Sequence, residues 1–188
     1  MNNQTLGTIA MICAPALLIE GLLMRRGENA AITGIESMIF MAGWICTNTG
    51  MRRMQAAGTG KWGRTVLLVQ LAGLVLAFLF GFFEATGLLG RDSIIFNVTD
   101  AAWPLSMLWM LVVGISVIVA KRLDGWQRFI PILCPFWLLI AIPGSMVLGD
   151  TAGGFLGFGY AALLWALLGY TVRDGRESVG ATPEPAVR

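Results

Sequence analysis

The chain has 188 residues, of which 56% are hydrophobic and 13% are charged, and its formal net charge is +2. A soluble domain of this size carries about twice that share of charged residues, because they must cover its surface. The composition therefore predicts an integral membrane protein, and since the basic residues form no long stripe, we expect no nucleic-acid partner.

Six apolar runs are long enough to cross the hydrocarbon core of a bilayer, which takes about 20 helical residues. They predict transmembrane helices over residues 6–24, 30–47, 65–83, 101–120, 129–148 and 152–172. Residues 1–172 would then form a single all-α domain, a bundle of six transmembrane helices. Residues 173–188 are polar and contain proline, which predicts a disordered cytoplasmic tail.

The first run resembles a secretory signal only in its position. No Lys or Arg precedes it, it is longer than the apolar part of a signal peptide, and it contains Glu20. We therefore expect it to be retained as a membrane span.

The distribution of basic residues predicts the orientation of the bundle. With both termini in the cytoplasm, ten of the thirteen Lys and Arg residues fall on the inner side, and Arg25, Arg26 and Arg91 face out. Because Lys and Arg accumulate in cytoplasmic loops, this bias favours an N-in, C-in arrangement. The general character of the chain is that of a small multi-pass protein of the bacterial cytoplasmic membrane.

The fifth and sixth runs differ from the others in their content of proline and glycine. Pro131, Pro135 and Pro143 interrupt the fifth run, and each proline removes a backbone hydrogen bond and kinks a helix. Gly153 and Gly157 stand at the start of the sixth run. We expect these glycines to mark close helix packing, with a cavity between broken helices as the alternative.

Acidic residues of several predicted spans fall at one level of the bundle. Carboxylates within the membrane are costly when they face lipid, so we expect them to face the bundle interior or a water-filled cavity. The candidates for a pocket that opens to the outer face are Glu20, Glu36, Glu84, Asp100 and Asp150.

The alternative interpretation of the same acids is structural. Arg25, Arg26 and Arg91 lie near them in the outer loops, and salt bridges across the helical hairpins would also explain why these arginines break the positive-inside bias. We favour the salt bridges over the pocket.

The chain contains no histidine, which excludes several classes of membrane enzyme. Histidine supplies most haem ligands, many ligands of catalytic zinc and the general base of many hydrolases. The three cysteines form no C-x-x-C pair, and no carboxylate pair has the spacing of a metal-binding motif on one helix face. We expect no catalytic residues, no metal site and no cofactor.

Three functional hypotheses remain. The first is a non-enzymatic accessory or structural subunit of a membrane complex. The second is a proton- or cation-coupled small transporter or binding protein that uses the acidic pocket. The third is a lipid-modifying enzyme that relies on carboxylates. The expected partners are the lipid bilayer and either other membrane proteins or further copies of the chain.

The second predicted loop, on the cytoplasmic side, is basic. Arg52, Arg53, Lys61 and Arg64 could bind anionic lipid head groups, although many inner loops have this composition. The segment completes no nucleotide-binding pattern.

Overall fold

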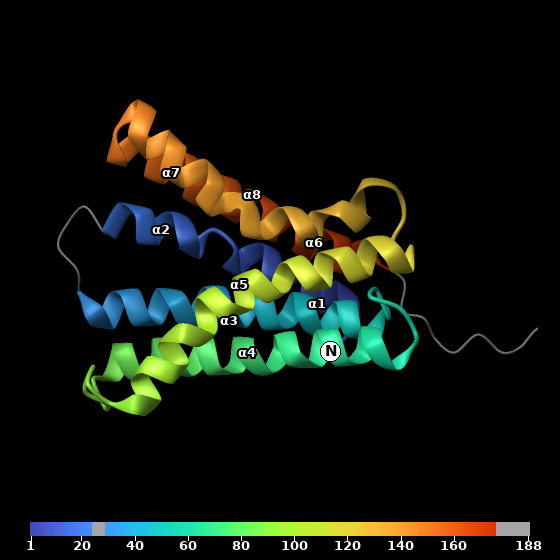
Figure 1. The fold of residues 1–188 in the computed structure, drawn as a ribbon, viewed down its shortest axis with the longest axis horizontal. Coiled ribbons are helices and arrows are strands. Elements are labelled where there is room, and N and C mark those ends of the chain that lie inside the picture. The colour runs from blue at the N-terminus through green and yellow to red at the C-terminus, as the bar shows by residue number, and fades with distance from the viewer. Residues whose placement is uncertain (24–28, 176–188) are drawn as a thin grey trace, which may run out of the picture.

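The computed structural model contains helices and no strand over the residues that it describes, which are 1–23 and 29–175 apart from the side chains of residues 20–23, 138, 150 and 151. The helices run along one long axis (Figure 1). In chain order they are α1 (Asn3–Cys13), α2 (Ala16–Leu23), α3 (Ala30–Arg53), α4 (Lys61–Thr86), α5 (Ile94–Ala120), the turn η1 (Gly125–Phe129), α6 (Ile130–Leu133), the turn η2 (Cys134–Phe136), α7 (Trp137–Leu148) and α8 (Asp150–Asp174).

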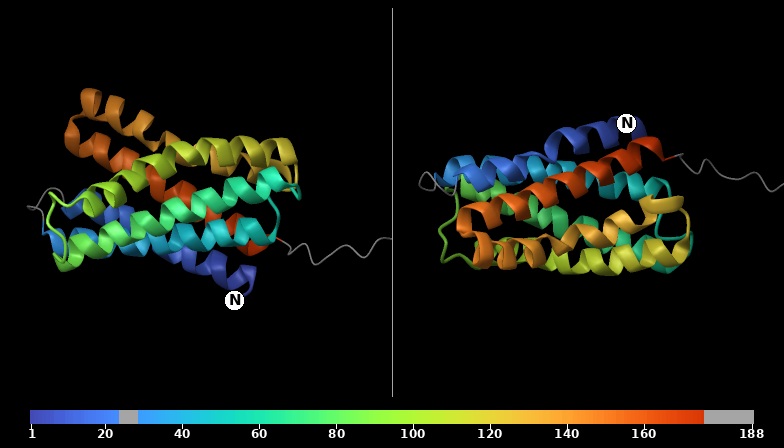
Figure 2. Two further views of the ribbon diagram at one scale, coloured as in Figure 1. Left: turned by 60° about the horizontal axis from the view of Figure 1, so that its bottom comes forward. Right: turned by 90° about the horizontal axis from the view of Figure 1, so that it is seen from above.

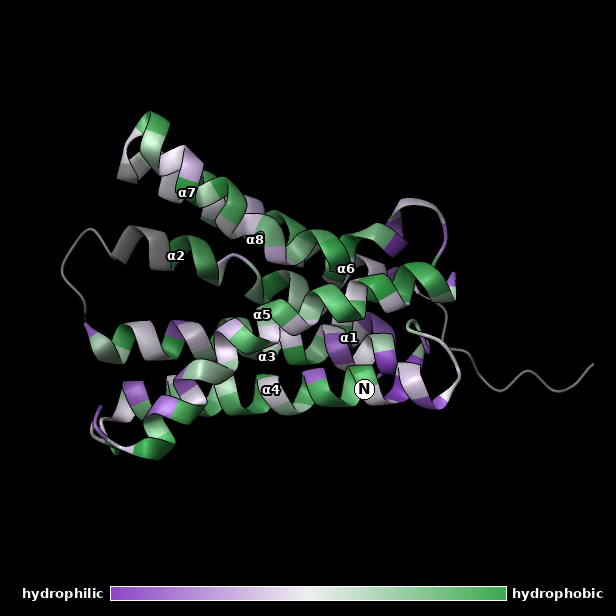
Figure 3. Cartoon of the chain, viewed as in Figure 1, coloured by the Kyte–Doolittle hydropathy of each residue, from purple (hydrophilic) through white to green (hydrophobic). Residues whose placement is uncertain are grey.

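Four of these helices are long and apolar enough to cross a membrane: α3, α4, α5 and residues Ala152–Asp174 of α8. A fifth span is reached if Gly125–Phe136 and Leu139–Leu148, which are bent by 55° relative to each other, are taken together. Hydrophobic residues cover the middle of the bundle and hydrophilic ones gather toward its ends (Figure 3). The described residues thus form an all-helical fold with four or five helices long and apolar enough to span a membrane, where the sequence predicted six.

The predicted first span is not one continuous helix. It divides into α1 and α2 at Ala14 and Pro15, because Pro15 has no amide hydrogen to continue the helical ladder. Other helices extend past their predicted ends: α3 continues to Arg53, and α5 begins at Ile94. Since α8 continues to Asp174, the first two residues of the predicted tail are helical, and residues 176–188 lie outside the described residues.

The fifth predicted span is interrupted near Pro131 and Pro135, whereas Pro143 lies inside the continuous helix α7 and does not break it. Pro131 opens α6, and Pro135 lies in η2, where the chain makes a tighter turn before α7 continues.

Two glycines of α8 pack closely against α7: a Cβ built on Gly153 would lie 2.0 Å from the backbone nitrogen of Ser145, and one built on Gly157 would lie 2.4 Å from the Cβ of Ala141. The close-packing interpretation is therefore confirmed for Gly153 and Gly157.

The core lies where α1, α3 and α8 meet. Trp44 of α3 and Trp165 of α8 are fully or almost fully buried, and their rings pack edge to face with centroids 5.1 Å apart. Phe40 completes the cluster at 5.3 Å from Trp165. On the other side of α3, α4 and then α5 extend the bundle, and α7 packs mainly on α8.

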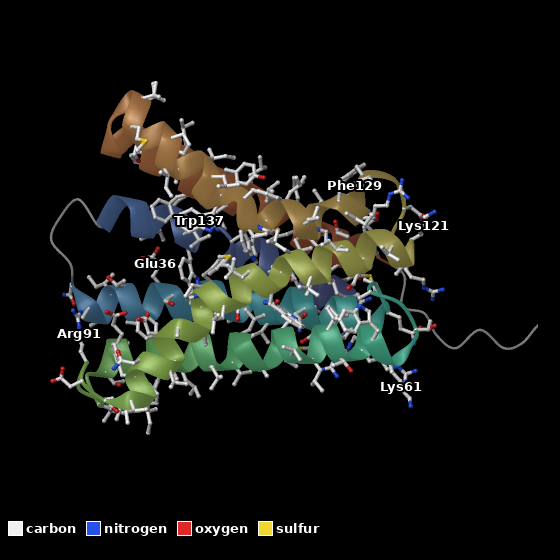
Figure 4. The ribbon with its side chains drawn as sticks, viewed as in Figure 1. Glu36, Lys61, Arg91, Lys121, Phe129 and Trp137 are labelled. Carbon is white, nitrogen blue, oxygen red and sulfur yellow. The ribbon has the colours of Figure 1, made fainter. Side chains whose placement is uncertain are left out.

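Both ends of the described chain lie at the same end of the bundle (Figure 2). The side-chain amide of Asn3 donates to the backbone oxygen of Gly175 at 3.4 Å. Lys61 and Lys121 lie at this end, which we call the basic end, and Arg91 lies at the opposite, acidic end (Figure 4).

Candidate functional site

A cavity of about 240 Å³ opens at the acidic end of the bundle. Four helices line it: α2 contributes Leu17, and the remaining lining comes from α3, α4 and α5. Three of the five predicted acids line this cavity, namely Glu36, Glu84 and Asp100. The fold therefore brings together acids that are up to 64 positions apart in the sequence.

Each of these three acids is paired with an aromatic residue one helical turn away. Phe40 follows Glu36 by four positions, Phe80 precedes Glu84 by four, and Trp103 follows Asp100 by three. Residues three or four apart share one face of a helix, and all three aromatic residues line the same cavity.

The direction of the helices places every ring deeper than its acid. α3 and α5 run from the acidic end inward, and α4 runs toward it, so Phe40, Phe80 and Trp103 each lie one turn farther from the acidic end. Along the bundle axis, the acids thus lie nearer the acidic end and the aromatic residues lie deeper, where they form what we call the aromatic floor. We call this arrangement the acid–aromatic cavity.

Ring packing holds the aromatic floor in place. Phe40 belongs to the core cluster with Trp44 and Trp165. Phe80 packs against Phe96 of α5 with ring centroids 5.2 Å apart, and Trp103 packs against Trp137 of α7 at 6.1 Å. Side chains with neighbours on several sides keep one rotamer, so the floor is preorganised.

A close contact between glycines brings α3 and α4 together at the level of the acids. A Cβ built on Gly34 would lie 2.4 Å from the backbone nitrogen of Ala85 and 2.5 Å from the backbone oxygen of Gly81. Neither helix could come so near with a larger side chain at this position. This contact sets the separation of Glu36 and Glu84, which stand close to it on their helices.

The acids differ in their environment. Glu36 is buried, with 5% of its surface exposed, and points from α3 toward α2 (Figure 4). Asp100 is exposed on α5. Glu84 forms an ion pair with Arg91, with Nη2 of the arginine 3.5 Å from Oε1 of the glutamate. Arg91 is therefore placed as the salt-bridge interpretation expected, on one of the acids that line the cavity.

The other predicted residues of the acidic region are not placed by the structure. Glu20 and Asp150 belong to α2 and α8, but their side chains lie outside the described residues, as do Arg25 and Arg26. That these residues form salt bridges and not a ligand pocket stays a prediction.

The predicted basic loop is only partly brought together. Arg52, Arg53 and Arg64 line a second cavity, of about 410 Å³, between the end of α3 and the start of α4. Lys61 is exposed, does not line this cavity, and projects from the basic end (Figure 4). Arg53 also donates a hydrogen bond to the backbone oxygen of Met1.

Sequence reasoning missed the aromatic and hydroxyl residues of the acid–aromatic cavity. Thr33 and Ser37 line it on α3, and neither was singled out. The signal was present, because an aromatic residue recurs one turn from each acid. In the part of the chain that the structure describes, no three His, Cys, Asp or Glu side chains, those of the acid–aromatic cavity included, are grouped closely enough to hold a metal ion.

No family model, no curated protein and no solved structure matches this chain.

Proposed function

We propose that this protein is a multi-pass membrane protein that binds a small organic cation, a protonated or quaternary amine, in the acid–aromatic cavity. The observation that carries this proposal is the position of three aromatic rings one turn beneath three carboxylates. Carboxylates attract a cation by charge, and the faces of aromatic rings attract it through their quadrupole. The two kinds of group together favour an organic ammonium ion.

The size of the cavity supports a small ligand. Pockets for drug-sized ligands measure about 300–1,000 Å³, whereas this one measures about 240 Å³. A compact ammonium group with a few carbon atoms fits such a volume. The buried Glu36 lines the cavity one helical turn from Phe40 on α3.

The proposed orientation places the acid–aromatic cavity on the outer face. We propose six spans in a bacterial cytoplasmic membrane, with α1 and α2 together as the first and both termini inside. Eight described Lys and Arg residues gather at the basic end with Asn3 and Gly175, as the positive-inside rule favours. Fusions of alkaline phosphatase and of green fluorescent protein after Arg64, Arg91 and Arg122 test this. Alkaline phosphatase activity after Arg64 or Arg122, or fluorescence after Arg91, contradicts the orientation.

The binding proposal is tested by thermal unfolding of the purified protein in detergent. Tetramethylammonium chloride is compared with sodium chloride at equal ionic strength. A ligand at 100 times its dissociation constant stabilises the folded state by about 2.7 kcal/mol. For a chain of this length that corresponds to a rise in Tm of roughly 5–10 °C.

Three variants distinguish binding of the cation in the cavity from its general attraction to negative charge on the protein. Glu36→Gln removes the buried charge, and Phe80→Leu removes a ring but keeps every acid; both should reduce the rise in Tm. Asp124→Asn is the control, since Asp124 is an exposed acid at the basic end. Equal responses of wild type to the two salts, or an equal loss in the Asp124→Asn control, would refute the proposal.

A role as an accessory subunit is the second candidate, and α7 favours it. Among the described elements, α7 packs mainly on α8 and η2, and its Met146 and Val147 are 83% and 80% exposed. A photo-crosslinking residue at Met146 should capture a stoichiometric protein partner or a second copy, whereas one at the exposed Val119 of α5 should not. Crosslinks to lipid alone at both positions would exclude this role for α7. The lipid-modifying enzyme stays a prediction from the sequence.

A further inference from the structure

The cavity at the basic end has a fixed shape, because the turn that forms it is packed into the bundle. Met54, Ala56 and Ala57 of this turn are all buried, at 5%, 0% and 5% exposure. The backbone nitrogen of Ala56 donates to the oxygen of Met51 at 2.9 Å, and that of Gly58 donates to the oxygen of Gln55 at 2.8 Å. The turn is therefore an ordered wall between two helices.

The start of α4 lies directly against this turn. A Cβ built on Gly63 would lie 2.3 Å from the backbone oxygen of Ala57, so only glycine permits the contact. Both Gly63 and Gln55 line the cavity. The first turn of α4 thus forms one side of the cavity, and the turn after α3 forms the other.

The cavity concentrates positive charge. Three of its lining residues, Arg52, Arg53 and Arg64, are arginines, and no acid lines it. Within the described residues, neither Arg52 nor Arg64 forms an ion pair with a carboxylate. All three arginines are exposed, so solvent screens their mutual repulsion, and an anion between them would reduce it further.

The local charges at the start of α4 are the reverse of those that stabilise a helix. A helix N-terminus carries partial positive charge and favours acids. The first turn of α4 has no acid, and its cap, Gly60, offers no side-chain hydrogen bond. Lys61 and Arg64 instead place cations there. An anion in the adjacent cavity would offset both the helix end and the arginines.

We propose that this cavity binds a phosphate group, supplied by an anionic phospholipid or by a soluble phosphate. Guanidinium groups match phosphate oxygens with paired hydrogen bonds, which makes arginine the preferred residue for such a site. This site is separate from the acid–aromatic cavity and lies at the opposite end of the bundle.

The test for a lipid source is native mass spectrometry of the delipidated protein titrated with phosphatidylglycerol. R52Q/R64Q should lower the affinity for this lipid by at least about tenfold, since both substitutions remove charged hydrogen bonds to the phosphate. R52K/R64K, which keeps the charge and loses the paired hydrogen bonds, should give an intermediate loss and serves if R52Q/R64Q does not fold. K121Q/R122Q is the matched control, since both residues are exposed at the same end and neither lines the cavity.

The test for a soluble source is the rise in Tm with sodium phosphate compared with sodium chloride at equal ionic strength. Loss of the response in R52Q/R64Q but not in K121Q/R122Q supports the site with a soluble ligand. The proposal is overturned if neither phosphatidylglycerol nor phosphate binds, or if both double variants lose binding equally, because general surface charge then accounts for it.

Discussion

Replacement of Gly34 by alanine should force α3 and α4 apart at the level of the acid–aromatic cavity. The new Cβ would lie 2.4 Å from the nitrogen of Ala85, about 1 Å short of the 3.4 Å at which ordinary contact begins. All three nearest atoms belong to the backbone of α4, so no side-chain rotation relieves the clash.

The magnitude follows from two opposing effects. Overpacking of a tight contact costs about 1–3 kcal/mol, and a contact made only with backbone should lie near the upper value. Alanine in a helix gains about 0.5–1 kcal/mol over glycine. We therefore expect Gly34→Ala to lower the free energy of unfolding by about 2 kcal/mol.

Gly159→Ala provides the matched control. Gly159 lies in α8, and a Cβ there meets no atom within 4 Å. The gain in helix propensity is common to both variants, so the difference between their unfolding free energies isolates the overpacking. Thermal unfolding in detergent, scaled by about 2–4 °C per kcal/mol, gives an expected drop in Tm of roughly 4–8 °C for Gly34→Ala.

The effect on the cavity is measured in the same experiment. Separation of α3 and α4 moves Glu36 relative to Glu84, so the stabilisation by tetramethylammonium should decrease in Gly34→Ala and persist in Gly159→Ala. If the two variants have the same Tm, α3 and α4 do not approach each other as closely as described. The explanation of how Glu36 and Glu84 come to line one cavity would then be wrong as well.

Three further predictions concern stability. Arg91→Ala should lower the free energy of unfolding by at most about 1 kcal/mol, because the Arg91 side chain that pairs with Glu84 is 74% exposed to solvent. A larger loss on chemical denaturation would mean that this ion pair is needed to hold α4 and α5 together. Gln70→Leu removes the hydrogen bond from Gln70 to the backbone oxygen of Ser106 at 3.2 Å and should cost about 0.5–1.5 kcal/mol, as measured by thermal unfolding. Trp44→Ala, at a fully buried ring, should cost about 3–5 kcal/mol; a nearly unchanged Tm would contradict its place in the core.

The sequence predicted a common depth for several acids, but it did not predict where all of the helices that carry them begin and end. These acids were predicted to lie at one level of the bundle, and three of them, Glu36, Glu84 and Asp100, line one cavity. The aromatic floor was missed because Phe40 and Phe80 are unremarkable in a membrane helix until their neighbours are known. The break at Pro15 was missed because hydropathy averages over a window and does not register a single lost hydrogen bond.

Composition and charge alone predicted a helical membrane protein, because a chain with so few charged residues cannot cover a soluble surface and lipid admits few backbone structures. They also indicated which end of the bundle is basic. Only the tertiary structure decided that Arg52, Arg53 and Arg64 share a cavity without Lys61, and that Glu36 and Glu84 line one cavity. The physical reason is that these relations depend on helix rotation and separation. Contacts such as that of Gly34 with Gly81 set both, and such contacts join positions far apart in the chain.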